Sequence, residues 1–167
     1  MNNRSSQQGG RESAVDQALQ RALSALNAQR PKDAEQIAAS ILETTPRHMR
    51  ALHIFGCALL LQGRSEEAIA PLEAAGRGQH DPEISTQLAI ALRQAGRTDE
   101  AVSRLKRAVK QRPPYPPAFR ELGSLLFALK QHGEAINILK QGLEFAPMLP
   151  DLSIQLGYVL QIGRAHV

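Results

Sequence analysis

The sequence contains no tryptophan, and aromatic residues make up only 4% of its 167 residues. Hydrophobic residues nevertheless reach 43%, so the apolar content is mainly alanine, leucine and isoleucine. Alanine and leucine favour helices, and few runs of β-branched or aromatic residues alternate with period two, as an exposed strand would require. We therefore expect an all-α protein without strands.

Cysteine is equally rare, because Cys57 is the only one. It cannot form an internal disulfide, which argues against a disulfide-stapled secreted module and favours a reducing compartment, the cytoplasm. No apolar run approaches the roughly 18 residues that span a bilayer, and the first residues lack the apolar core of a signal peptide. We expect a soluble protein that does not insert into membranes, with a disordered tail over residues 1–13.

Positive charge is only slightly in excess, since the sequence has 20 lysines and arginines and 16 acidic residues. A formal net charge of +4 does not by itself indicate a nucleic-acid partner. The segment 104–112 carries five positive charges, but no aromatic residues interleave with them for base stacking. A solvated helix face is the preferred interpretation, with contact to phosphates or another anionic surface as the alternative, so no nucleic acid is expected.

The sequence also lacks the common motifs of catalytic and cofactor-binding sites. There is no phosphate-binding GxxxxGK loop and no HExxH, CxxC or GxSxG arrangement, so we predict no enzyme activity and no cofactor. The acidic pairs Glu66–Glu67 and Asp99–Glu100 are interpreted as first-turn residues that favour the positive end of a helix dipole. His53 and Cys57 share a helix face, but a metal would need two further ligands, so no metal site is expected.

Small residues recur with a regular period. Two series of small residues repeat every 33 or 34 residues. The members of the first are alanines that each follow an acidic residue directly, and the members of the second are glycine or alanine. Such a period predicts stacked supersecondary units, and small residues let two helices cross closely. We expect these residues to pack the repeats together: Ala34, Ala68, Ala101 and Ala135 in one series, and Gly56, Ala89, Gly123 and Gly157 in the other.

Each half of the repeat is predicted to be one short amphipathic helix, because apolar residues recur at spacings of three and four. Gly63 and Gly96 lie between the halves, where a tight turn requires a residue that tolerates positive φ. Prolines fall at or after the end of the second halves, where they interrupt a helix. These are Pro46, Pro82, Pro113 and Pro147.

The repeat resembles the tetratricopeptide repeat of bacterial proteins. The matching pairs are Phe55–Gly56, Leu88–Ala89, Leu122–Gly123 and Leu156–Gly157, together with the four alanines. The early tryptophan of the family is replaced by Leu52, Ser85, Phe119 and Ser153. The resemblance implies a right-handed α-solenoid of antiparallel helix pairs with about nine helices. Repeats are expected at residues 14–47, 48–81, 82–115 and 116–149, with a half repeat at 150–161, and the first is the least typical unit, as expected of a terminal cap.

The resemblance also implies a scaffold that binds a peptide or a partner helix in its concave groove. This groove is lined by the first of the two helices in each repeat, which we call the first helices. Three arginines in that groove would favour an acidic or carboxylate-bearing partner. The predicted lining is Arg50, His53, Cys57, Thr86, Ile90, Arg93, Arg120, Ser124, Phe127, Ile154 and Tyr158.

The array is expected to stop in the middle of a unit, with no second helix after the one at 150–161. Residues 162–167 read as an in-frame translation of a common sequencing adapter, so we interpret them as a non-native tail and the sequence as a fragment. Two alternatives follow. The array is the N-terminal recognition module of a longer sulfotransferase or glycosyltransferase, or it self-associates through the uncapped last helix.

Overall fold

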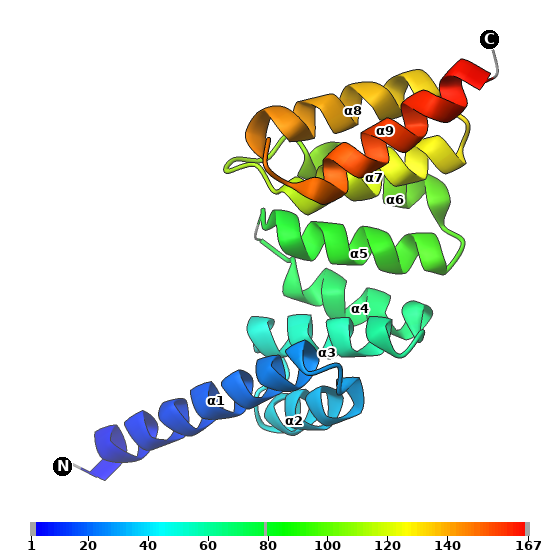
Figure 1. Cartoon of the computed structure of the whole chain (residues 1–167). Coiled ribbons are helices and arrows are strands. Elements are labelled where there is room, and N and C mark those ends of the chain that lie inside the picture. The colour runs from blue at the N-terminus through cyan, green and yellow to red at the C-terminus, as the bar shows by residue number, and fades with distance from the viewer. Residues whose placement is uncertain (1–2, 79, 166–167) are drawn as a thin grey trace. The chain divides into compact units, whose positions relative to one another are not determined.

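The computed structural model describes residues 3–78 and 80–165 of the chain, and within these ranges it contains nine α-helices and no strand (Figure 1). The all-α fold predicted from the sequence is confirmed for this part of the chain. None of the described helices is both long and apolar enough to cross a bilayer. The helices are α1 (Asn3–Asn27), α2 (Pro31–Thr44), α3 (Met49–Leu61), α4 (Ser65–Ala75), α5 (Pro82–Gln94), α6 (Thr98–Ala108), α7 (Pro116–Ala128), α8 (His132–Phe145) and α9 (Pro150–Ala165).

The first and last helices extend past the predicted limits of the array. Helix α1 begins at Asn3, inside the segment 1–13 that was expected to be a disordered tail, and α9 continues to Ala165, beyond Gln161. Helical hydrogen bonds join residues four apart in one segment, and adding a residue to an existing helix is far easier than starting one. A helix can therefore continue beyond its packed residues, which a repeat pattern does not reveal.

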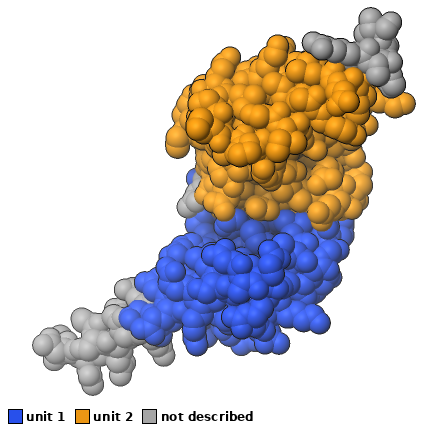
Figure 2. Space-filling view, in the orientation of Figure 1, with its two compact units in different colours: residues 1–78 blue, residues 79–167 orange. Residues whose placement is uncertain are grey.

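The chain divides into two compact units, residues 1–78 and 79–167 (Figure 2). In unit 1, α2 packs against both α1 and α3, and α4 packs against α3. The core is rich in alanine, which allows the helix backbones to approach closely. Its buried residues include Leu19, Ala22, Ala25, Ala34, Ala38, Ile41, Ala51, Ile54 and Ala58.

Unit 2 repeats this arrangement with α5 to α9. Helix α6 packs against α5 and α7, and α8 packs against α7 and α9. Among the first helices of the repeats, α7 contacts both α5 and α9. Phe119, at the position of the family's tryptophan, is 1% exposed and fills the centre of this unit. The other large buried side chains here are Leu88, Leu92, Leu105, Leu122, Leu126, Leu139, Leu152 and Val159.

The turns inside the repeats share one backbone conformation. Gly63 and Gly96 have φ of 75° and 82°, as predicted. The equivalent positions in the first and fourth repeats also have positive φ, but they hold Gln29 at 56° and Lys130 at 61°. The turn therefore has the same backbone conformation in repeats that lack the glycine, because the two helices that it connects require that conformation.

The first helices α5, α7 and α9 begin with proline, and aspartate precedes α5. Pro82 occupies the first turn of α5, where its missing N–H leaves no hydrogen bond unmade. The Asp81 carboxylate before it accepts hydrogen bonds from the backbone N–H of Glu83 at 2.8 Å and of Ile84 at 3.4 Å. Pro46, Pro113 and Pro147 lie between helices. Proline thus separates the repeats, as predicted.

Candidate partner-binding face

In unit 2, an exposed apolar strip runs along the first helices α7 and α9. Ile154 and Tyr158 of α9 are 71% and 57% exposed. The ring of Tyr158 meets Phe127 of α7 edge-on, with 5.6 Å between centroids, and Phe127 also lies 5.0 Å from the ring of His132. These residues form an aromatic surface with the aliphatic side chain of Ile154 one helical turn from Tyr158.

The two predicted arginines of unit 2 are bridged by acidic residues of the neighbouring first helices. Arg93 of α5 lies 3.9 Å from the carboxylate of Glu121 on α7. Arg120 donates to the same carboxylate at 3.0 Å and to Asp151 of α9 at 3.2 Å. A ladder of charges therefore crosses α5, α7 and α9. Sequence reasoning missed both acidic members, because the contacts of Glu121 with Arg93 and of Asp151 with Arg120 join different helices.

The remaining predicted residues of unit 2 differ in their exposure. Thr86 is only 2% exposed, and its hydroxyl donates to the carbonyl of Pro82 at 2.6 Å. It therefore offers no surface to a partner. Ile90 of α5 is partly buried, and Ser124 of α7 is exposed. We define the first-helix face by the predicted residues with exposed surface: Ile90, Arg93, Arg120, Ser124, Phe127, Ile154 and Tyr158.

The other three predicted residues belong to α3 of unit 1. Arg50 is exposed and lies 3.8 Å from the carboxylate of Asp16 on α1, so it too faces an acid of a neighbouring first helix. His53 and Cys57 are partly buried one turn apart. No group of three or more potential metal ligands gathers anywhere in the described residues.

The predicted packing residues lie in the helix crossings, with one exception. Ala34, Ala68, Ala101 and Ala135 are completely buried, and Ala89 is 1% exposed. A Cβ added at Gly56 would lie 2.5 Å from Leu72, and one at Gly123 would lie 2.6 Å from Leu139. Gly157 is exposed, and no described atom comes within 4 Å of such a Cβ.

One close crossing was not predicted. A Cβ at Gly142 of α8 would lie 2.8 Å from Phe119 and 3.2 Å from Leu152. Gly142 therefore lies where α8 packs closely against both α7 and α9. The equivalent residues of the two preceding repeats, Ala75 and Ala108, are also small and completely buried, so the repeat period could have identified this position.

The second helices begin with a recurring ion pair. Arg64 donates to Glu67 at 2.6 Å and to Glu35 of the preceding repeat at 2.7 Å, and Gln62 donates to Glu35 at 2.6 Å. The hydrogen bond from Gln62, followed by those from Arg64, lowers the pKa of Glu35. The bond from Arg64 lowers the pKa of Glu67 in the same way. These contacts agree with the structural role predicted for the acidic residues.

The same arrangement occurs one repeat later, where Arg97 donates to Glu100 at 2.7 Å and lowers the pKa of that carboxyl. In the first repeat, Arg30 lies 3.4 Å from Asp33. In each case an arginine directly before the helix pairs with an acid in its first turn. The acids serve the helix start, where their charge is favoured.

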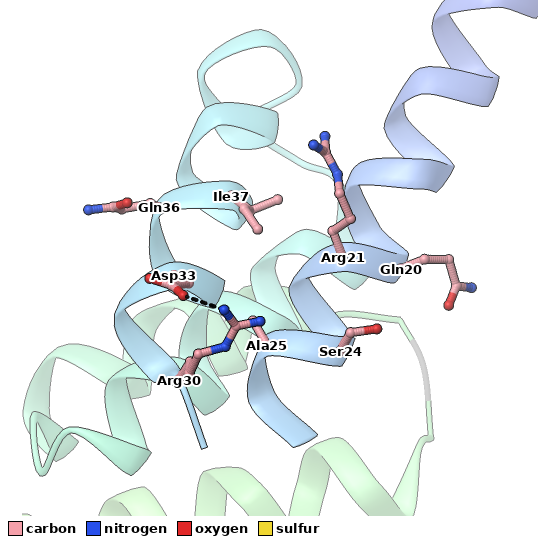
Figure 3. A pocket seen from close by; sticks show the side chains of 8 residues that line it. All are labelled: Gln20, Arg21, Ser24, Ala25, Arg30, Asp33, Gln36 and Ile37. Atoms are coloured by element: carbon pink, nitrogen blue, oxygen red, sulfur yellow. Dashed lines mark ion pairs between the residues drawn. The ribbon is translucent and has the colours of Figure 1, made fainter. Parts of the chain in front are cut away.

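An open groove of about 510 Å³ lies between α1 and α2 in unit 1, beside the Arg30–Asp33 ion pair (Figure 3). Three of the four α1 residues in its lining are polar, whereas two residues one repeat later, Ile54 and Ala58, are buried in the core. Polar residues therefore line the groove at positions where the next repeat has core residues. The lining residues are Gln20, Arg21, Ser24, Ala25, Arg30, Asp33, Gln36 and Ile37.

Helix pairs with small residues at the crossings and a turn of positive φ inside each of four pairs are the architecture of an interaction module. Two family models, both described as tetratricopeptide repeat, match residues 19–82 and 92–153, which together are well over half of the chain. The chain belongs to the tetratricopeptide repeat family. Repeats of this kind mediate protein–protein interaction.

Solved structures show the same fold at low sequence identity. A thermophilic tetratricopeptide repeat protein of Thermus thermophilus has a TM-score of 0.78 and 20% identity, over 88% of this chain and 81% of that one. PilF of Pseudomonas aeruginosa has a TM-score of 0.81 and 20% identity, over 93% and 72%. MamA of Desulfovibrio magneticus has a TM-score of 0.71 and 19% identity, over 80% and 76%. No curated protein shows significant sequence similarity to the chain.

Proposed function

We propose that the chain is a scaffold that holds a polypeptide partner on the first-helix face of unit 2, and that it acts by binding rather than by catalysis. The family supports an interaction module. The observation that carries the choice of this face is the strip of Phe127, Ile154 and Tyr158, with two large side chains more than half exposed. Aromatic anchors of this kind dominate the energy of protein interfaces.

The charges beside this strip favour a partner with a carboxylate next to an apolar side chain. Arg93 and Arg120 are each about two-fifths exposed, with side-chain exposures of 44% and 39%. Ion pairs at such sites contribute about 0–1 kcal/mol, so an incoming carboxylate can replace Asp151 on Arg120 at little cost. A partner bound here would also exclude water, which strengthens the new charge-assisted hydrogen bonds.

A peptide library displayed on phage tests this proposal, because selection from a library does not require an identified partner. Selection against the wild-type protein is expected to enrich peptides with an aromatic or aliphatic residue close to Asp or Glu. Binding of the enriched peptides should fall about tenfold or more in the double variant Arg93→Glu, Arg120→Glu, because a like charge then faces the peptide carboxylate. Fluorescence anisotropy with a labelled peptide measures the affinity.

The matched control is Arg107→Glu, Lys110→Glu, which changes the net charge equally at exposed residues near the end of the second helix α6. It should leave binding unchanged. Tyr158→Ala should weaken binding without any change of charge, because it removes an exposed anchor. Peptides that bind the double variant as well as they bind the wild type would show that the first-helix face is not the binding surface.

A further inference from the structure

Asp151 of α9 lies beside the exposed apolar strip and contacts one of the two arginines of the first-helix face. It stands in the first turn of α9, three residues before Ile154 and seven before Tyr158. Residues at these spacings share one face of a helix, so Asp151 continues the strip. Its Oδ2 accepts a hydrogen bond of 3.2 Å from Nη1 of Arg120 on the neighbouring helix α7. Asp151 therefore holds Arg120 at the place where an acidic partner would put its carboxylate.

The two acids that contact Arg120 differ in how firmly they are held. Glu121 has a side-chain exposure of 16%, and its two carboxylate oxygens point to different arginines: Oε1 accepts from Arg120 at 3.0 Å, and Oε2 lies 3.9 Å from Arg93. Asp151 has a side-chain exposure of 61% and pairs with Arg120 alone among the described residues. Water solvates a released carboxylate best where the side chain is already exposed. Glu121 thus keeps both arginines in place, and Asp151 is the acid that a partner displaces.

We propose that Asp151 is an intramolecular competitor of the partner's carboxylate: in the free protein it occupies Arg120, and the partner's carboxylate binds there when Asp151 leaves. This inference rests on the proposed function and adds the regulation of the same face. The apparent affinity of a site falls with the fraction of molecules in which the site is free. Because exposed ion pairs are weak, the contact with Asp151 lowers the affinity for an acidic partner by about two- to sixfold.

Asp151→Asn tests the competition, because it removes the charge and keeps the shape of the side chain. The probe is the fluorescein-labelled form of the peptide that the phage selection enriches most strongly, and anisotropy measures its affinity for the intact protein. The variant should bind this peptide about two- to sixfold more tightly than the wild type does. An analogue of the peptide with Asn or Gln in place of its acidic residue should bind both proteins equally.

Glu83→Gln is the matched control. Glu83 also directly follows the proline that begins a first helix, at the start of α5, and it is exposed. It forms no ion pair with another described residue, so its replacement removes the same charge without freeing an arginine and should leave the affinity unchanged. In a background of Arg120→Gln, the change Asp151→Asn should have no effect, because the group for which the two carboxylates compete is then missing.

Three results would overturn the inference alone: equal affinity of the wild type and Asp151→Asn, the same gain in Glu83→Gln, or a gain that persists in the background of Arg120→Gln. Circular dichroism of each variant shows that a change of affinity does not come from unfolding. Failure to enrich any peptide, or full binding to Arg93→Glu, Arg120→Glu, would instead overturn the proposed function and the role of Asp151 together.

Discussion

At the scale of single residues, glycine meets two different needs in this chain. Gly56 and Gly123 sit in helix crossings where a methyl group would overlap a buried leucine. Gly63 and Gly96 sit in turns with positive φ, where space is open but a side chain strains the backbone. Gly157 meets neither need in the described residues. A substitution by alanine should therefore have different consequences at these positions.

Gly123→Ala and Gly157→Ala are expected to change stability in opposite directions. The first forces Leu139 out of its place in a closely packed core and should lower the free energy of unfolding by about 1–3 kcal/mol. The second replaces an exposed helical glycine and should raise the free energy of unfolding by about 0.5–1 kcal/mol. Urea denaturation followed by circular dichroism measures both. A stabilised Gly123→Ala variant would contradict the packing at this crossing.

Replacing Lys130 by glycine should stabilise the protein, because the φ of 61° at this position is a left-handed conformation that a side chain disfavours. Lys130→Gly is expected to raise the free energy of unfolding by about 0.5–1 kcal/mol. Gly96→Ala is the reverse change at the equivalent turn, with φ of 82°, and should destabilise the protein. If both variants moved the urea midpoint in the same direction, strain at these turns would not be the cause.

At the scale of helices, the second helices begin in an unusual way. An arginine stands at the position before the helix in α2, α4 and α6, with no side-chain hydrogen bond to the helix start. A positive charge there is opposed by the helix dipole. An acid in the first turn compensates by pairing with the arginine, and in α4 the pair also reaches Glu35 in the preceding repeat. The pair thereby connects two repeats.

This connection should depend on pH. The pKa of Glu35 is lowered by the hydrogen bond from Gln62 and then by Arg64, so Glu35 stabilises the fold above its ordinary pKa of 4.5. That stabilisation is lost as the pH falls below 4.5 through the lower pKa of the folded protein. The wild type should therefore exceed Glu35→Gln in urea midpoint at neutral pH, by a small amount because the pair is partly exposed.

The difference between wild type and Glu35→Gln should shrink when the titration is repeated in acid. Glu66→Gln serves as the control, because it removes one exposed carboxylate near the same helix start with an equal change of net charge. A difference that is unchanged at the lowest pH would mean that the carboxylate charge of Glu35 does not contribute.

At the scale of the whole molecule, the two units each have their own core. In unit 2, α5 to α9 bury Phe119 and a set of leucines among themselves. Repeat arrays derive their stability from each repeat and its nearest neighbours. The protein therefore does not need contacts between distant parts of the chain to form this core.

Residues 79–167 expressed alone are expected to be helical and to unfold in one cooperative transition. The reason is that the core of unit 2 comes from its own helices. Circular dichroism and a thermal melt test this, with Leu122→Ala as the control, which should lower the free energy of unfolding by about 2–5 kcal/mol by leaving a cavity. A fragment without helical signal or without a transition would show that this unit depends on the rest of the chain.

The sequence by itself determined the helices, their pairing into repeats and the turns between them. These features depend on local spacing: three and four residues for an apolar helix face, and 33 or 34 for the repeat. Only the tertiary structure decided which predicted residues reach the surface. In the folded chain Thr86 is buried, Glu121 contacts both Arg93 and Arg120, and no described atom lies close to Gly157 where a Cβ would be. The contact between Arg93 and Glu121 joins two helices, and the exposure of Thr86 and Gly157 depends on which helices pack over them. Both depend on the placement of side chains in space, which a periodic pattern along one chain does not record.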